Sequence, residues 1–308
     1  MEIALQFVLL ALGFVMLGKG ADWFVEGAAG IAMRFGIPQL VIGLTIVAMG
    51  TSAPEAAVSI AAAVKGNADI TIGNIVGSNI LNILVILGLA ASIVPIAVAR
   101  STVRIEIPFM IGVTALLFYQ GRDSSISLAD GGVLMVAFAA YMMYLYTMAM
   151  KSNVDSDLEE PGLPLGRCLL GAVGGLALII AGSNVTVGAA TSIATYAGLS
   201  ERFIGLTIVA LGTSLPELFP SVAAARRGNA DIAIGNIVGS NIFNILFVVG
   251  LSSLIIDIPF ASAFNFDTYV ALGAAVLLWL CVLRTQRLQR WAGALMLMCY
   301  VAYLGYIL

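Results

Sequence analysis

The sequence reads IGLTIVAMGTSAPE at residues 42–55 and IGLTIVALGTSLPE at residues 204–217. Each copy continues to the segment GNIVGSN, at residues 73–79 and again at residues 235–241. The copies are 162 residues apart, and over positions 42–84 they differ at only ten of 43 positions. Each copy places one glutamate inside a long apolar run. A carboxylate there is expensive in a membrane, which makes it a candidate functional group.

The composition is that of a membrane protein. Of the 308 residues, 61% are hydrophobic and only 10% are charged, whereas soluble domains carry about 25% charged residues. Apolar runs long enough to span a bilayer recur along the whole length, so we expect a multi-pass protein whose principal partner is the lipid bilayer. The runs and their Gly and Pro breaks predict an all-α fold with ten transmembrane helices, approximately at 3–30, 38–64, 71–95, 104–119, 128–150, 164–193, 200–225, 233–256, 267–284 and 290–307.

The repeat divides the chain into two halves of five helices. We expect a first half at residues 1–150, a short acidic cytoplasmic linker at 151–163, and a second half at 164–308. The repeated motif occupies 42–84 in the first half and 204–246 in the second.

Lysine and arginine are unevenly distributed among the predicted loops. The loops on one side hold ten of these residues, and those on the other side hold three. Because cytoplasmic loops are enriched in Lys and Arg, we expect a plasma (inner) membrane protein with both termini outside. Five is an odd number of helices, so the second half enters the membrane from the opposite side. The sequence therefore predicts an inverted repeat, with ion sites near the membrane midplane.

Several classes of function are excluded by what the sequence lacks. It contains no histidine, which removes histidine-based metal sites and serine–histidine catalysis. It has neither the basic patch typical of nucleic-acid binding nor the P-loop motif of an ATP-driven pump. Cys168, Cys281 and Cys299 lie in or beside apolar runs and are interpreted as small buried residues. We expect no enzyme activity, no cofactor and no obligatory protein partner.

The proline beside each glutamate predicts a broken helix. Pro54 lacks the N–H that would bond the carbonyl of Gly50, so we expect a break that opens backbone carbonyls from Ala48 onward. Thr51 lies four residues before Glu55, on the same helix face. The second copy repeats this arrangement. Hydroxyls, carboxylates and carbonyls are hard oxygen donors, and this set suits Ca²⁺ or Na⁺.

The second part of the motif predicts close helix packing. Gly73 and Gly77 form a GxxxG pattern, which lets two helices approach closely. Ser78 and Asn82 are four residues apart and share a face. We therefore expect this face to pack against the broken helix and to add polar groups beside the glutamate.

The first predicted helix carries three charges near its inner end. Lys19, Asp22 and Glu26 are spaced so that mutual pairing is expected. The positions 162 residues later hold Ala181, Asn184 and Gly188, so the charges are not repeated. An anchoring role is the simplest interpretation.

The doubled motif resembles a known family. GTSAPE and GTSLPE, each followed by GNIVGSN, resemble the α-repeats of the Ca²⁺/cation antiporter superfamily, and most closely the prokaryotic sodium/calcium exchanger type. The resemblance covers the whole chain. It implies exchange of Ca²⁺ for Na⁺ by alternating access, with the first and sixth helices sliding across a core of the second, third, seventh and eighth.

The resemblance also implies a set of residues that bind the transported ions. Glu55 and Glu217 are the central ligands in this interpretation. The other members of the set contribute hydroxyl, amide or carbonyl oxygens; they are Thr51, Ser52, Thr213, Ser214, Ser78, Ser240, Asn82, Asn244, Ala48 and Ala210. Many relatives carry Asp at the position of Asn244, so this chain has only two carboxylates in the core. Potassium co-transport is therefore disfavoured.

Two other functions remain open at this point. A Ca²⁺ (or other divalent cation)/H⁺ antiporter could use the same two buried carboxylates as proton carriers. The TSxPE motif and the absence of histidine favour Na⁺ as the coupling ion. A cation channel is a further alternative, although an inverted repeat around a closed site is more typical of a carrier.

Overall fold

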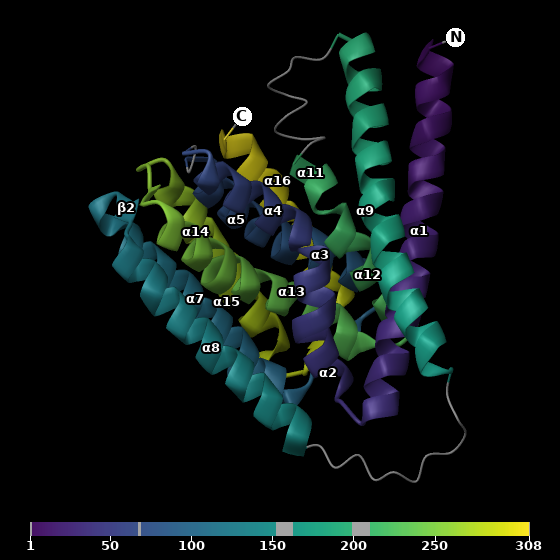
Figure 1. The fold of residues 1–308 in the computed structure, drawn as a ribbon, viewed down its shortest axis with the longest axis horizontal. Coiled ribbons are helices and arrows are strands. Elements are labelled where there is room, and N and C mark those ends of the chain that lie inside the picture. The colour runs from purple at the N-terminus through teal and green to yellow at the C-terminus, as the bar shows by residue number, and fades with distance from the viewer. Residues whose placement is uncertain (1, 67–68, 152–162, 199–209, 308) are drawn as a thin grey trace.

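The computed structural model describes residues 2–66, 69–151, 163–198 and 210–307, and it is helical almost throughout (Figure 1). The first half contains α1 (Glu2–Phe35), α2 (Gln39–Ile42), η1 (Gly43–Val47), α3 (Ala48–Thr51), α4 (Ala53–Val64), α5 (Asp69–Leu81), η2 (Asn82–Leu87), α6 (Gly88–Ile93), η3 (Thr102–Glu106), α7 (Ile107–Gln120), η4 (Gly121–Asp123) and α8 (Leu128–Lys151). The second half contains α9 (Leu165–Tyr196), α11 (Ala210–Thr213), α12 (Leu215–Arg226), α13 (Ala230–Phe243), η6 (Asn244–Val249), α14 (Gly250–Ile255), α15 (Phe264–Leu283) and α16 (Arg290–Ile307).

Within these described ranges, eight helices are long and apolar enough to cross a membrane. A ninth span results if the bent pair Gln39–Thr51 and Ala53–Val64 is counted as one. The predicted helix 200–225 begins outside the described residues, and α11 with α12 is its described part. Most of the predicted linker 151–163 also lies outside them. The multi-pass helical fold is thus confirmed, while ten helices stay a prediction.

The predicted break beside Glu55 is present. The helix axis bends by 51° between Thr51 and Ala53. Pro54 stands in the first turn of α4, where its missing N–H removes no hydrogen bond. Pro216 has the same place in α12. The proline therefore begins a new helix in each half, with the glutamate in its first turn.

Helices α1 and α9 form an antiparallel pair at one flank of the bundle (Figure 1). Small residues allow their backbones to touch. A Cβ added at Gly20 would lie 2.9 Å from the carbonyl oxygen of Gly175, and one added at Gly171 would lie 3.0 Å from that of Trp23. The pair contacts the rest of the bundle mainly through α12. Close backbone packing makes α1 and α9 a single unit.

Two short antiparallel strand pairs tie the halves together, which the sequence did not predict. β1 (Ile96–Ala97) pairs with β4 (Arg287–Leu288), and β2 (Ser125–Ile126) pairs with β3 (Ile258–Pro259). β1 and β3 are 162 residues apart, as are β2 and β4. The repeat in the sequence therefore recurs in the pairing of the loops.

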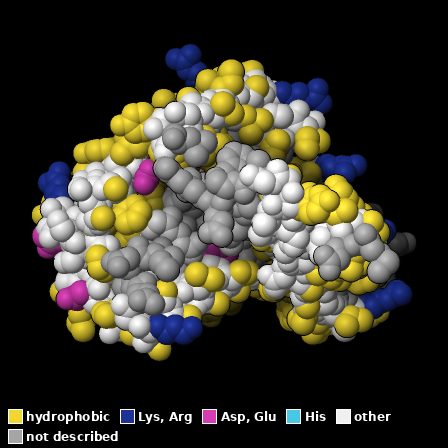
Figure 2. Space-filling view, turned by 90° about the horizontal axis from the view of Figure 1, so that it is seen from above, with side chains coloured by type: hydrophobic (Ala, Val, Ile, Leu, Met, Phe, Trp, Pro, Cys, Tyr) yellow, Lys and Arg dark blue, Asp and Glu magenta, His cyan; other side chains and the backbone are white. Residues whose placement is uncertain are grey.

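The surface is that of a membrane protein. Both chain ends lie at the same end of the molecule, opposite the last residues of α8 and the first residues of α9 (Figure 1). Figure 2, seen from the end with the termini, shows hydrophobic side chains interspersed with uncharged atoms over the described surface, and a few charged side chains mostly near the edge. Large apolar residues such as Leu170, Val136 and Tyr306 are more than two-thirds exposed. Exposed apolar area on this scale suits contact with lipid.

Candidate functional site: an oxygen-lined centre

Two buried glutamates lie at the centre of the bundle. Glu55 is 2% exposed and Glu217 is 1% exposed, and each stands in the first turn of the helix that follows a break. The first repeat brings Glu55 toward Glu217, because Ser52, three residues before Glu55, is hydrogen bonded to the carboxylate of Glu217. Two carboxylates held together in an apolar bundle require a compensating cation or proton.

The two carboxylates have different partners. The hydroxyl of Ser52 donates a hydrogen bond to Oε1 of Glu217 over 2.9 Å, so the first repeat supports the glutamate of the second. Both carboxylate oxygens of Glu55 and Oε2 of Glu217 have no partner among the described residues. The hydroxyl of Ser214, the counterpart of Ser52, is also buried without a partner. The centre therefore contains several buried oxygens that are not hydrogen bonded.

An amide from the second half connects both broken helices. Asn236 Nδ2 donates to the backbone carbonyl of Glu217 over 3.2 Å and to Ser221 Oγ over 2.9 Å. Its Oδ1 accepts a hydrogen bond from the hydroxyl of Thr51 over 3.0 Å, and this bond joins the two halves. Asn74 makes the corresponding bonds to the carbonyl of Glu55 and to Ser59. These amides fix the first turn of each glutamate-bearing helix.

Four asparagines form a symmetric square where α5 continues into η2 and α13 continues into η6. Asn79 and Asn241 each donate to the other's backbone carbonyl over 3.2 Å. Asn82 donates to Oδ1 of Asn241 over 2.9 Å, and Asn244 donates to Oδ1 of Asn79 over 3.0 Å. Every bond has a counterpart in which each residue is replaced by the one 162 positions away. Oδ1 of Asn82 and Oδ1 of Asn244 stay without a partner.

The GxxxG pattern of the second half packs against the first half. A Cβ added at Gly235 would lie 3.1 Å from Cα of Gly43, and one at Gly239 would lie 2.7 Å from the carbonyl of Leu44. Ser240 follows directly and donates to the carbonyl of Ala48 over 3.3 Å. The expected close approach to a broken helix is confirmed for this half, and it crosses between the repeats.

The predicted ion ligands fall into three groups. The structure joins Ser52 to Glu217, Ser240 to Ala48, and Asn82 and Asn244 to the asparagine square. It also joins Thr51 to Ala48, because the Thr51 hydroxyl donates to the Ala48 carbonyl over 3.3 Å. Glu55 and Ser214 are buried with side-chain oxygens that have no partner among the described residues, and Ser78 and Thr213 lie in the same motifs. The side chain of Ala210 lies outside the description.

The proline break does not free the carbonyl of Ala48 from its helical hydrogen bond. That carbonyl accepts from the backbone N–H of Ser52 over 3.0 Å, because α3 continues through Thr51 and the helix breaks only afterwards.

The donor set of the centre contains only oxygen. Carboxylate, hydroxyl and amide oxygens are the ligands that Ca²⁺ and Na⁺ prefer, whereas softer metals prefer nitrogen and sulfur. No cluster of three or more His, Cys, Asp or Glu side chains that could hold a metal occurs within the described residues. The centre therefore provides two formal negative charges and a set of neutral oxygens.

Comparison with known proteins agrees with this geometry. The family model for sodium/calcium exchanger proteins matches residues 5–147 and 168–308.

The chain belongs to the sodium/calcium exchanger family.

Two relatives match this chain over almost their whole length. It is 41% identical over 314 residues to the candidate antiporter CaxA of Alkalimonas amylolytica, with 98% of each chain covered. It is 34% identical over 345 residues to the sodium/calcium exchanger MaX1 of Methanosarcina acetivorans, again with 98% of each covered. Its structure is similar to that of the sodium-calcium exchanger NCX_Mj soaked with zero Na⁺ and Ca²⁺, with a TM-score of 0.87 and 33% identity, over 99% of this chain and 100% of that one.

Part of the network in this exchanger-family centre was not predicted from the sequence. Four asparagines, which hold the glutamate helices and the two halves together, were not among the predicted residues; these are Asn74, Asn79 and their counterparts Asn236 and Asn241. The signal was present, because all four recur at the 162-residue offset within the apolar motif. A repeated asparagine in a membrane helix is a candidate for interhelical hydrogen bonding even where it binds no ion.

Proposed function

We propose that this protein is a secondary antiporter that exchanges Ca²⁺ for Na⁺ by alternating access. Ca²⁺ binds between Glu55 and Glu217, and Na⁺ competes for the same oxygens. The observation that carries the proposal is the group of buried oxygens without hydrogen-bond partners, on both glutamates and on Ser214. Buried oxygens of this kind are costly unless a cation or a proton occupies the space between them.

The remaining ligands are assigned from the same motifs. Thr51, Ser52 and Thr213 supply hydroxyls beside the glutamates, and Ser78 and Ser240 supply hydroxyls from the packing helices. Neutral oxygens complete the shell through the backbone of Ala48 and Ala210 and the side chains of Asn82 and Asn244. With two carboxylates, one Ca²⁺ or two Na⁺ ions neutralise the site, whereas three Na⁺ ions would leave a net charge of +1 to be moved.

The architecture that goes with this mechanism is ten helices in two inverted repeats. Two observations support it. The asparagine square and the strand pairs are each unchanged when every residue is replaced by the one 162 positions away. The first glutamate-bearing segment, α2 to α4, also runs in the opposite direction to α11 and α12 (Figure 1). The Lys and Arg bias then places both termini outside the plasma (inner) membrane.

Reconstituted protein tests the proposal directly. We expect ⁴⁵Ca²⁺ uptake into vesicles when a Na⁺ gradient is imposed, and loss of that uptake in Glu55→Gln. Empty vesicles and the Glu106→Gln variant, which changes a buried glutamate of η3 outside the centre, are the controls. Uptake that ignores the Na⁺ gradient, or that persists in Glu55→Gln, would contradict the proposal.

Proton coupling is the second candidate, because paired buried carboxylates can also carry protons. Replacing Na⁺ by choline at a fixed pH gradient separates the two. Uptake that survives this replacement and follows the pH gradient would establish a Ca²⁺/H⁺ antiporter with the same architecture.

A further inference from the structure

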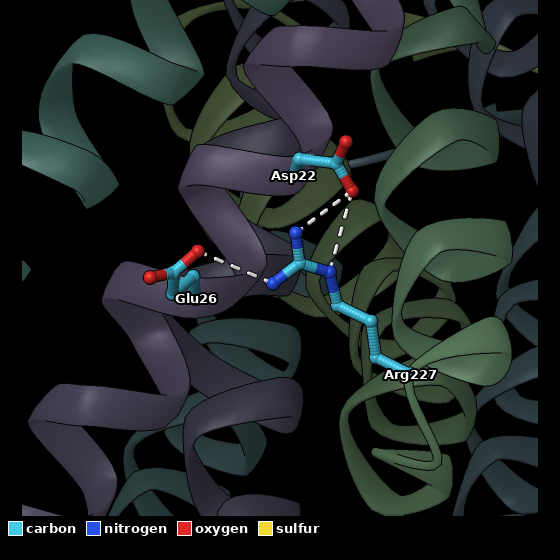
Figure 3. Close-up of polar contacts among 3 residues, drawn as sticks. All are labelled: Asp22, Glu26 and Arg227. Carbon is cyan, nitrogen blue, oxygen red and sulfur yellow. Dashed lines mark hydrogen bonds and ion pairs between the residues drawn. The ribbon is translucent and has the colours of Figure 1, made fainter.

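One arginine connects the α1–α9 pair to the core by two ion pairs (Figure 3). Arg227 Nη2 lies 3.0 Å from Asp22 Oδ1, and its Nη1 lies 3.3 Å from Glu26 Oε2. Its Nε also donates to Asp22 over 3.3 Å. The expected mutual pairing with Lys19 is wrong, since no ion pair of Lys19 occurs in the described part of the chain. The two carboxylates of α1 instead face a residue from the opposite half.

These ion pairs span the boundary between two units of the fold. Arg227 directly follows α12, which carries Glu217 in its first turn. Asp22 and Glu26 belong to α1, whose close backbone contacts are with α9. A cavity of about 580 Å³ lies between α1, α6 and α12, with Asp22 and Arg227 in its wall and Leu218 among its lining residues. The ion pair between Asp22 and Arg227 therefore lies in the wall of a cavity that also reaches Leu218, the residue that follows Glu217.

The ion pairs have no counterpart at the other end of the bundle. The residue 162 positions before Arg227 is Lys65, which keeps the positive charge. The residues 162 positions after Asp22 and Glu26 are Asn184 and Gly188, which carry none. If the halves exchange their environments during transport, Lys65 meets no carboxylate on α9. The charge pattern is thus one-sided within a repeat that is otherwise nearly symmetric.

We propose that Arg227, Asp22 and Glu26 form a one-sided ionic latch, which favours the conformation in which α1 and α9 close the bundle at this end. By the Lys and Arg bias this end is cytoplasmic. The inference rests on the alternating access proposed above. A third to a half of each side chain is exposed, so the latch is a surface ion-pair network of modest strength. It shifts the ratio of the two conformations by about two- to fivefold.

Spin-label distances test the latch without any transport assay. Labels are attached at Met33→Cys on α1 and Met150→Cys on α8, which are both well exposed at this end, after the three native cysteines are replaced by alanine. We expect Arg227→Gln to raise the population with a longer distance by about two- to fivefold. Asp22→Asn combined with Glu26→Gln should raise it equally, and the triple variant should add nothing further.

The matched control is Lys65→Gln, the same change at the equivalent position of the other repeat. It should leave the distance distribution unchanged. An unchanged distribution in Arg227→Gln, or an equal shift in Lys65→Gln, would overturn the latch. Full additivity between the α1 and Arg227 variants would also overturn it, because residues that act through one contact are not additive.

Transport gives a second measurement, in which a simple loss of stability would not produce the expected result. In oriented vesicles, Arg227→Gln should raise the apparent Ca²⁺ affinity from the cytoplasmic side and lower it from the other side, each by about two- to fivefold. A change of the same sign on both sides would overturn the latch. Absence of Na⁺-driven flux in the unmodified protein would refute the proposed function, and the distance measurement would still decide the latch.

Discussion

Two sets of contacts at the centre of this protein join the repeats, and only one of them is symmetric. The asparagine square is made twice over, with every bond matched by its counterpart at the 162-residue offset. The bond from Ser52 to Glu217 is made once, while Ser214 and Glu55 stay without partners. Near-identical sequences therefore produce identical contacts within the asparagine square and different contacts around the glutamates.

The difference teaches which parts of the centre are fixed and which respond to the surroundings. The square lies where the two halves meet each other, so both copies have the same neighbours. The helices α4 and α12 do not, because α12 packs along α1 and is tied to it by Arg227. An asymmetric surrounding imposes an asymmetric centre. In an alternating-access carrier, the asymmetric contacts are the ones expected to exchange during transport.

The largest effect should come from the glutamates. Both should contribute equally to Ca²⁺ affinity, although only Glu217 accepts a hydrogen bond from a serine. Glu55→Gln and Glu217→Gln are each expected to lower the apparent Ca²⁺ affinity by about 30-fold or more, because each removes one of two charges that hold a divalent ion in a buried site. Ca²⁺-dependent flux at graded concentrations measures this. Glu106→Gln, on η3, should retain transport. A tolerated Glu217→Gln would show that the two glutamates have separate roles.

The serines should show the asymmetry most clearly. In ion-free protein, Ser52→Ala should lower the free energy of unfolding by about 1.5–3 kcal/mol, because it removes a hydrogen bond to a buried carboxylate. Ser214→Ala should have little effect, since its hydroxyl has no partner. Thermal unfolding in detergent with a Ca²⁺ chelator compares the two. Equal losses would mean that both serines support a glutamate.

In the asparagine square, by contrast, equivalent substitutions in the two halves should have equal effects on stability. Asn82→Ala and Asn244→Ala should each cost about 1–3 kcal/mol, because each leaves a buried carbonyl oxygen on its partner without a donor. The two losses should be equal within experimental error. Unfolding in graded denaturant measures both losses of stability. Unequal losses would show that the asparagine square is asymmetric as well.

The smallest difference is expected between the amides that support the glutamate helices. Asn236→Ala should be more destabilising than Asn74→Ala by about 0.5–1.5 kcal/mol, because Asn236 also accepts from Thr51 of the opposite half. Thr51→Val should remove this excess without affecting Asn74→Ala. An excess that persists in the Thr51→Val background would assign it to burial rather than to the bond.

Most of the fold follows from local features of the sequence. Long apolar runs predict where the spans lie, and α8 and α16 begin and end within one residue of their predicted limits. Pro54 predicts the break before Glu55, because a proline cannot continue the hydrogen bonding of a helix. The strand pairs could not be predicted, since each consists of two residues and is made by segments more than 130 positions apart.

The sequence by itself determined the repeat, the two carboxylates within long apolar runs, the broken helices and the oxygen chemistry of the centre. These depend on residue type and spacing along one chain. Only the tertiary structure decided which glutamate Ser52 bonds, how four asparagines close a square, and that Arg227 pairs with Asp22 and Glu26 rather than leaving them to Lys19. The physical reason is that such contacts join residues from opposite halves. Which partner each residue contacts depends on how the two halves pack. The motif is nearly the same in both halves, so its local sequence does not distinguish between the possible partners.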